Sequence, residues 1–152
     1  VILAGQAALL SERIAADETR TADRPGLRAG AHAIDVSPRT FPILINGGFL
    51  RNTTTKVNDS LFAKCLVLDD GTTRLAIVIV DSCMMPRELL DRAREMAREK
   101  TGIATDRMLI AATHTHSAPA AMGALGCPAD AAYVALGSAS LASPRFPTRS
   151  SP

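Results

Sequence analysis

The chain has 152 residues, of which 47% are apolar, 3% aromatic and 21% charged, and its formal net charge is +2. The small, mixed charge and the few aromatic side chains argue against nucleic acid as a partner, because nucleic-acid surfaces use basic patches and stacking rings. Apolar runs such as Leu75–Val80 are far shorter than the ~20 residues of a transmembrane helix, so no membrane-spanning segment is predicted.

Residues 1–28 are predicted to form a leader or linker, with a break at Pro25-Gly26. The opening stretch VILAGQAALL is about as long as the apolar core of a signal peptide. A clipped signal peptide would place the protein in a secreted or periplasmic compartment. An ordinary short helix is the alternative interpretation.

Two apolar stretches follow the leader. AGAHAIDVSP (29–38) is predicted to form a short strand that closes at Pro38, and FPILINGGF (41–49) leads into Asn46-Gly47-Gly48. Two adjacent glycines indicate either a sharp turn or a close approach of the backbone to another group. A turn is the more common of these two roles.

The segment LFAKCLVLDDGTTRLAIVIVDS (61–82) predicts a β-hairpin. Two β-rich runs flank Asp70-Gly71, a dipeptide favoured in tight turns whose two central residues both have positive φ. The second run, Leu75–Val80, is almost continuously apolar, so we expect its strand to be covered on both faces.

An amphipathic helix is predicted over residues 87–100, starting at Pro86 and stopping at Gly102. Its apolar positions recur at intervals of three and four residues and are Leu89, Leu90, Ala93, Met96 and Ala97. The run MLIAAT (108–113) then returns to strand character. The order strand, helix, strand predicts a βαβ unit with parallel strands. The fold class is therefore α/β: a hairpin plus a βαβ unit, forming part of a larger mixed sheet in an incomplete domain.

Functional side chains stand at the ends of both predicted parallel strands. Asp81 follows the first strand, and His114 and His116 follow the second in LIAATHTHSAPA (109–120). Because functional groups in α/β sheets collect beyond the carboxyl ends of parallel strands, we expect the acid and the histidines to meet at one rim.

The His-x-His pair predicts a metal site on chemical grounds. Residues i and i+2 of an extended segment project to the same side, so His114 and His116 can face one point. Zinc accepts neutral imidazole nitrogen, activates water and polarises carbonyl groups, while Asp81 and the neighbouring hydroxyls can orient the rings. From spacing alone, a hydrogen-bonded surface pair is an equally good interpretation, and a carboxylate after a strand commonly serves as a cap.

The three cysteines contain no Cys-x-x-Cys pair, so the sequence predicts neither a disulfide framework nor a zinc knuckle.

Towards the C-terminus, CPADAAYVAL (127–136) has the character of a starting helix. Residues 137–152, GSASLASPRFPTRSSP, are predicted to be a disordered tail. The abrupt loss of periodicity is typical of an out-of-frame translation, and a native tail on a truncated protein is the alternative.

Residues 29–136 resemble the N-terminal part of the neutral/alkaline, non-lysosomal ceramidases, in the form of a bacterial relative. The resemblance rests on GAHAIDVSP, ILINGGFL, the hairpin segment through Pro86, and TGIATDRMLIAATHTHSAPA. ATHTHS followed by a small residue and Pro resembles the zinc-site signature of that family, whereas SAPAAMGALG departs from its SGPGG.

The resemblance implies a zinc-dependent amide hydrolase that converts N-acylsphingosine and water into sphingosine and a fatty acid. It implies that His114 is the zinc ligand, that His116 assists at the amide, and that Asn46, Gly47 and Gly48 border the substrate. The family's other His, Glu and Tyr ligands would lie downstream, and Tyr133 is in the wrong segment to be one. We therefore expect this chain to be inactive alone. The alternatives are a non-catalytic α/β remnant and another His-x-His metal hydrolase with a non-ceramide substrate.

Overall fold

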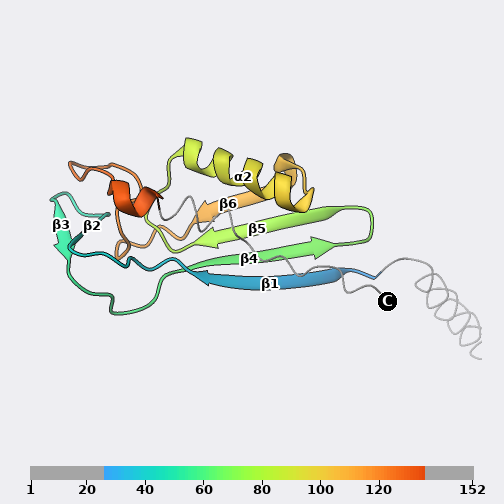
Figure 1. Ribbon diagram of the computed structural model, residues 1–152, viewed down its shortest axis with the longest axis horizontal. Coiled ribbons are helices and arrows are strands. Elements are labelled where there is room, and N and C mark those ends of the chain that lie inside the picture. Colours follow the sequence, from blue (N-terminus) through green and yellow to red (C-terminus); the bar gives the residue numbers. More distant parts are fainter. Residues whose placement is uncertain (1–25, 136–152) are drawn as a thin grey trace, which may run out of the picture.

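The computed structural model describes residues 26–135, so the predicted tail 137–152 and all but the last residues of the predicted leader 1–28 lie outside the described residues. The described part contains a four-stranded mixed sheet with the order β1-β4-β5-β6 and a two-stranded sheet of β2 and β3 (Figure 1). The strands are β1 (Arg28–Asp35), β2 (Ile43–Ile45), β3 (Asn52–Thr54), β4 (Phe62–Asp69), β5 (Arg74–Val80) and β6 (Met108–Ala112). This arrangement confirms the predicted α/β class.

The predicted hairpin is formed by β4 and β5, but its turn differs from the expected one. Asp69 pairs with Arg74, which leaves four residues in the loop, and of Asp70 and Gly71 only the glycine has a positive φ, 89°. The Asp70 carboxylate accepts hydrogen bonds from the backbone N–H groups of Thr72 and Thr73, at 2.9 and 2.6 Å. This side chain organises the turn itself, so the backbone does not need two residues in the left-handed region.

The predicted βαβ unit is confirmed. Helix α2 (Arg87–Thr101) ends at Gly102, whose φ of 69° lets its N–H reach the carbonyl of Arg98 at 2.8 Å. A short 3-10 helix, η1 (Thr105–Arg107), leads into β6. β5 and β6 are parallel, with Ala76 opposite Met108 and Val80 opposite Ala112.

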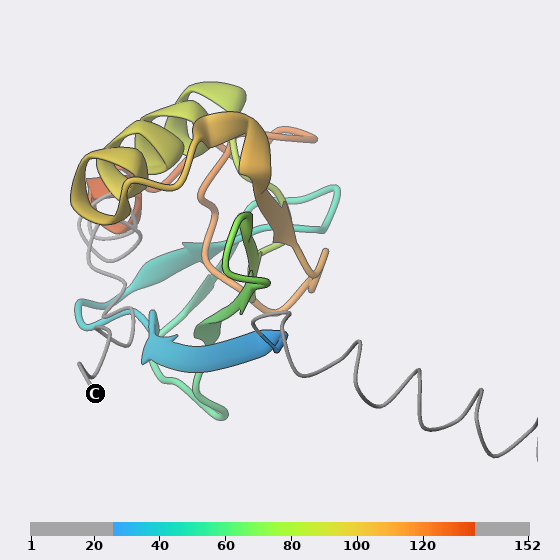
Figure 2. The ribbon, with the colours of Figure 1, turned by 90° about the vertical axis from the view of Figure 1, so that its right-hand side faces the viewer.

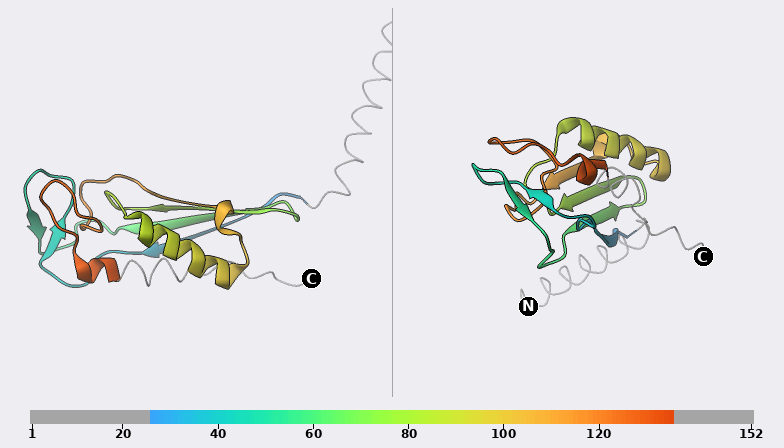
Figure 3. Two further views of the ribbon diagram at one scale, coloured as in Figure 1. Left: turned by 90° about the horizontal axis from the view of Figure 1, so that it is seen from above. Right: turned by 60° about the vertical axis from the view of Figure 1, so that its left-hand side comes forward.

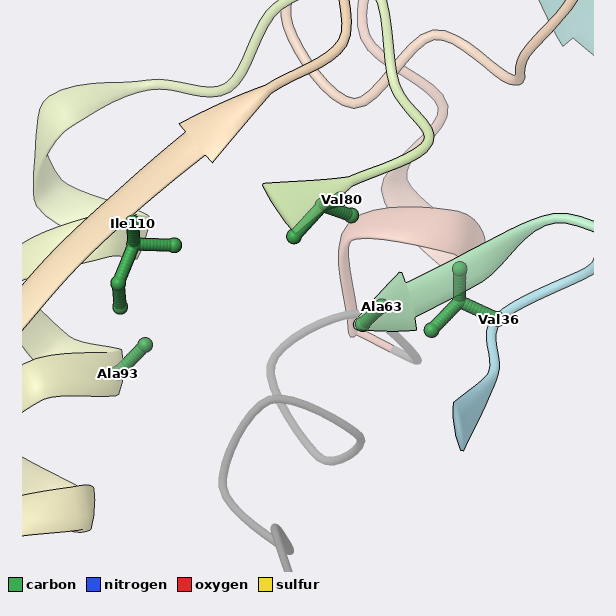
Figure 4. Close-up of a cluster of buried hydrophobic side chains, with 5 residues drawn as sticks. All are labelled: Val36, Ala63, Val80, Ala93 and Ile110. Carbon is green, nitrogen blue, oxygen red and sulfur yellow. The ribbon is translucent and has the colours of Figure 1, made fainter. Parts of the chain in front are cut away.

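The core lies between α2 and one face of the sheet. Figure 4 shows side chains from α2, from β4, β5 and β6, and from the end of β1 converging on one cluster, which consists of Val36, Ala63, Val80, Ala93 and Ile110. A second cluster along the same face contains Ala76, Ala97, Ile103 and Met108. The apolar stripe of the helix thus packs as its period predicted, with Leu89, Ala93 and Ala97 buried.

The opposite face of the sheet is exposed among the described residues. α2 lies on one side only (Figure 2), and Leu66, Leu75 and Leu109 on the other side are 38%, 43% and 54% exposed. The expectation that the strand at 75–80 is covered on both faces is therefore wrong for this part of the chain. Within residues 26–135, no helix is both long and apolar enough to cross a membrane.

The small β2–β3 sheet lies beyond the ends of β5 and β6 (Figures 1 and 3). The segment after β6 is tied to it, because Asn46 donates its backbone N–H to Ala118 at 3.1 Å and Ala120 donates to Leu44 at 2.9 Å. An isolated bridge also pairs Ile45 with Pro119. These contacts bring the loop after β2 to the rim where the parallel strands end.

Candidate metal centre

Three potential metal ligands gather at the carboxyl ends of β5 and β6. One ligand atom from each of Cys83, His114 and His116 lies within 4.8 Å of the others. Cys83 is buried, whereas the two histidines are exposed. Imidazole nitrogen and thiolate sulfur are the donors that zinc prefers, so the chemistry of the cluster suits that ion.

The parallel pairing of β5 and β6 explains why these residues meet. Val80 and Ala112 lie opposite each other at the strand ends, and Thr113 donates its N–H to the Val80 carbonyl at 2.9 Å. The chain therefore leaves both strands at the same rim, where Asp81 is the first residue after β5 and His114 the second residue after β6. The prediction that these two exits share one end of the sheet is confirmed.

The two histidines converge by a different route from the one predicted. Their ring centroids are 5.1 Å apart with an interplanar angle of 71°, yet β6 ends at Ala112 and His114 has a φ of 62°. The pair therefore does not belong to an extended segment with alternating side chains. A left-handed conformation costs a non-glycine residue about 1–2 kcal/mol, and the contacts of the rim hold His114 in it.

His114 is oriented by the loop that follows β5. Its Nδ1 lies 2.9 Å from the carbonyl oxygen of Cys83, so an Nδ1–H donor there leaves the Nε2 lone pair for a metal. Ser82, which is 1% exposed, fixes this loop: its N–H donates to the Val80 carbonyl, and its hydroxyl donates to the Met84 carbonyl at 3.2 Å.

The predicted glycine loop packs directly against His116. A Cβ placed on Gly47 would lie 2.5 Å from Cγ of His116, and Gly47 has a φ of 104°, so this position requires glycine. Asn46 is 2% exposed, donates its side-chain amide to the Met122 carbonyl at 2.7 Å and accepts the Gly47 N–H at 2.9 Å. Gly47 therefore has both of the roles considered for these glycines: the chain turns there, and the backbone lies close to the side chain of His116.

Asp81 stands at the same rim but outside the ligand cluster. Its carboxylate accepts the Phe62 N–H at 3.0 Å, and its own N–H donates to the Phe62 carbonyl at 2.8 Å. These contacts extend the β4–β5 pairing by one step, as a strand cap does. The catalytic role of Asp81 stays a prediction.

Tyr133 lies in the helical turn at 131–135, where CPADAAYVAL was predicted to start a helix. It is 6% exposed and packs with Ile43 and Ala121. Burial, followed by the negative charges of Asp81 and Asp35, raises the pKa of Tyr133 to about 12. Its side chain therefore belongs to a hydrophobic cluster and is neutral at physiological pH.

Cys83 was not predicted to belong to the site. It lies three positions after Val80, so the rule that located Asp81 and His114 at the strand ends points to it as well. It belongs to no Cys-x-x-Cys pair, and the side chains near it are histidines distant in the sequence.

Neither a protein-family model nor a curated protein matches the sequence. Among solved structures, the fold is similar to that of neutral ceramidase from Pseudomonas aeruginosa, with a TM-score of 0.54 and 22% identity. The alignment covers 64% of this chain and 16% of that one. A structure of a ceramidase complexed with C2 aligns over the same shares, at 22% identity and a TM-score of 0.47. The chain thus shares its fold with about a sixth of the length of the Pseudomonas aeruginosa enzyme.

Proposed function

We propose that this chain supplies the histidine pair of a zinc-dependent amide hydrolase of the neutral ceramidase type. The reaction is the conversion of N-acylsphingosine and water into sphingosine and a fatty acid, on a ceramide-like lipid or a related N-acyl substrate. One observation carries the proposal: His114 and His116 converge at the functional rim of a fold similar to that of a neutral ceramidase.

The residues present fit zinc. His114 faces the Cys83 carbonyl through Nδ1, and a zinc-binding histidine characteristically gives its second ring N–H to such an acceptor. Zinc at this position would supply Lewis-acid polarisation of the amide carbonyl and activation of water. His114 is the proposed zinc ligand.

The remaining residues act around that ligand. His116, exposed beside His114, would assist the amide carbonyl or the activated water. Asn46 and Gly47 hold the loop against His116, and Gly48 continues it along the substrate side. Asp81 supports the site by fixing the exit of β5.

The test measures hydrolysis of a fluorescent N-acylsphingosine by the protein expressed from its complete gene, together with its zinc content by elemental analysis. His114→Ala should remove zinc and lower hydrolysis by ~100-fold or more, because it deletes the proposed ligand. His32→Ala on β1 is the matched control, since it removes the remaining histidine of the chain, outside the cluster.

Unchanged zinc content in the His114→Ala protein would show that the ligand assignment is wrong. Zinc binding with no turnover of any N-acyl or ester substrate would instead indicate a non-catalytic remnant. Preference for simple esters or amides over N-acylsphingosine would indicate a different His-x-His hydrolase.

A further inference from the structure

Cys83 is the one member of the candidate metal centre to which the proposed function gives no role for its side chain. The residue is 2% exposed, yet its Sγ lies within 4.8 Å of a nitrogen from each histidine ring. We propose that Cys83 is a third protein ligand, so that Cys83, His114 and His116 together bind zinc. The inference deepens the proposed function and rests on it for the identity of the ion, and it makes coordination of that ion the way in which His116 assists.

The spacing of the three side chains suits a common ion. With Zn–S near 2.3 Å and Zn–N near 2.0–2.1 Å, ligand atoms in a tetrahedral zinc site lie about 3.3–3.6 Å apart. The three atoms are already within 4.8 Å of one another, so small rotations of exposed imidazoles close the difference.

The backbone around the cluster keeps the three groups together. The same residue, Cys83, offers its thiol to the cluster and its carbonyl to Nδ1 of His114, which couples the two ligands. The buried Ser82 fixes the loop on one side, and Gly47 limits His116 on the other. Such outer contacts orient metal ligands and strengthen binding.

The donor set also predicts which ions bind. Cys83 would bind as thiolate, and its proton would pass to solvent, so the site would carry one negative charge from the protein. One soft sulfur and two imidazoles favour zinc and cobalt over magnesium and calcium, which prefer oxygen. Three protein ligands with an exposed side leave a coordination position open, as catalytic zinc sites do.

The decisive experiment is X-ray absorption at the zinc edge of the zinc-loaded 152-residue chain. We expect one sulfur near 2.3 Å and nitrogen near 2.0–2.1 Å from the metal. Cys83→Ala should remove the sulfur signal and weaken zinc binding about 100-fold, because it deletes a ligand and not only an outer contact. Cys65→Ala is the matched control: this half-buried cysteine on β4 lies outside the cluster and should leave both measurements unchanged.

A zinc spectrum with only nitrogen and oxygen neighbours overturns the inference, as does a sulfur signal that survives Cys83→Ala. If that variant fails to fold, the zinc spectrum of the unmodified chain still decides whether sulfur is bound, and the cobalt-loaded chain must show a thiolate charge-transfer band.

Measurements of hydrolysis separate this inference from the proposed function. Loss of turnover with His114→Ala but not with Cys83→Ala leaves the proposed function standing without this inference. A sulfur ligand without any hydrolysis keeps the inference and rejects the function.

Discussion

At the scale of single residues, Gly47 controls the position of His116. Gly47→Ala would place a Cβ 2.5 Å from Cγ of His116, so the ring must move although no ligand is removed. We expect zinc affinity to fall by about 10–100-fold, as when an outer contact of a ligand is lost. Competition with a chromophoric chelator measures this affinity.

The neighbouring glycine provides the control for this change. A Cβ on Gly48 would have its nearest contact, the Leu50 carbonyl oxygen, at 3.6 Å, an ordinary van der Waals distance. Gly48→Ala should therefore bind zinc like the unmodified chain. Equal losses in both variants would mean that the loop, and not the contact with His116, determines the affinity.

Tyr133 permits a titration of a single residue, because the chain has one Tyr and no Trp. Tyrosinate absorbance should appear with a midpoint of about 12, well above the ordinary value of 10.0, since burial and the charges of Asp81 and Asp35 disfavour the phenolate. A folded-state pKa above the unfolded value contributes stability that is complete below pH 10 and is lost as pH rises through about 12.

Asp81→Asn tests the cause of this shift. It removes the charge but keeps an oxygen that can accept the Phe62 N–H, so the Tyr133 midpoint should fall while circular dichroism stays unchanged. Asp59→Asn, in an exposed loop, should leave the midpoint in place. A midpoint near 10 in the unmodified chain would contradict the buried position of Tyr133.

The sequence pattern was sufficient to predict that the two histidines converge, but not the backbone conformation through which they do so. The His-x-His spacing and the strand before it predicted a convergent pair, whereas the left-handed φ of His114 depends on contacts with a loop 31 residues earlier. Cys83 belongs to that same loop, close to the end of β5, and the parallel register of β5 and β6 brings its side chain to the histidines. Distant contacts of this kind leave no local signature in the sequence.

At the scale of elements, the two faces of β6 should respond differently to truncation. Ile110 is 8% exposed and packs with Ala93 of α2, whereas its neighbour Leu109 points to the other face and is 54% exposed. Ile110→Ala should lower the free energy of unfolding by about 2–4 kcal/mol, because it leaves a cavity in a packed core. Leu109→Ala should cost under about 1 kcal/mol, because little apolar area is removed from contact.

Urea denaturation followed by circular dichroism compares the two variants. The same measurement on the complete gene product is informative about the exposed face. A large cost for Leu109→Ala there, with a small cost in the 152-residue chain, would mean that other residues cover this face. Equal costs for Ile110→Ala and Leu109→Ala in the 152-residue chain would contradict the observed one-sided core.

Elements with strong local patterns were predictable, and elements that depend on distant partners were not. The period of α2, its stop at Gly102 and the hairpin at Gly71 follow from neighbouring residues. The pairing of β1 with β4 and the separate β2–β3 sheet join segments whose sequence carries no record of the partner. The expectation that β5 is covered on both faces was wrong among residues 26–135. A continuous apolar run predicts that a strand is buried, but it does not identify the element that packs against each face.

At the scale of the whole molecule, metal binding and catalysis should separate. The zinc ligands proposed above all lie within residues 83–116, so the 152-residue chain should bind zinc. Hydrolysis needs more, because bulk water must be excluded and the lipid amide held, and both imidazoles of the His114–His116 pair are exposed. The aligned region also corresponds to 16% of the Pseudomonas aeruginosa ceramidase, so most of that enzyme's length has no counterpart in the match. We therefore expect the zinc-loaded 152-residue chain to release no more sphingosine from a fluorescent N-acylsphingosine than its His114→Ala variant does. The Pseudomonas aeruginosa enzyme, assayed in parallel, is the positive control.

Turnover that disappears with His114→Ala would contradict this expectation and show that one exposed rim is sufficient for the reaction.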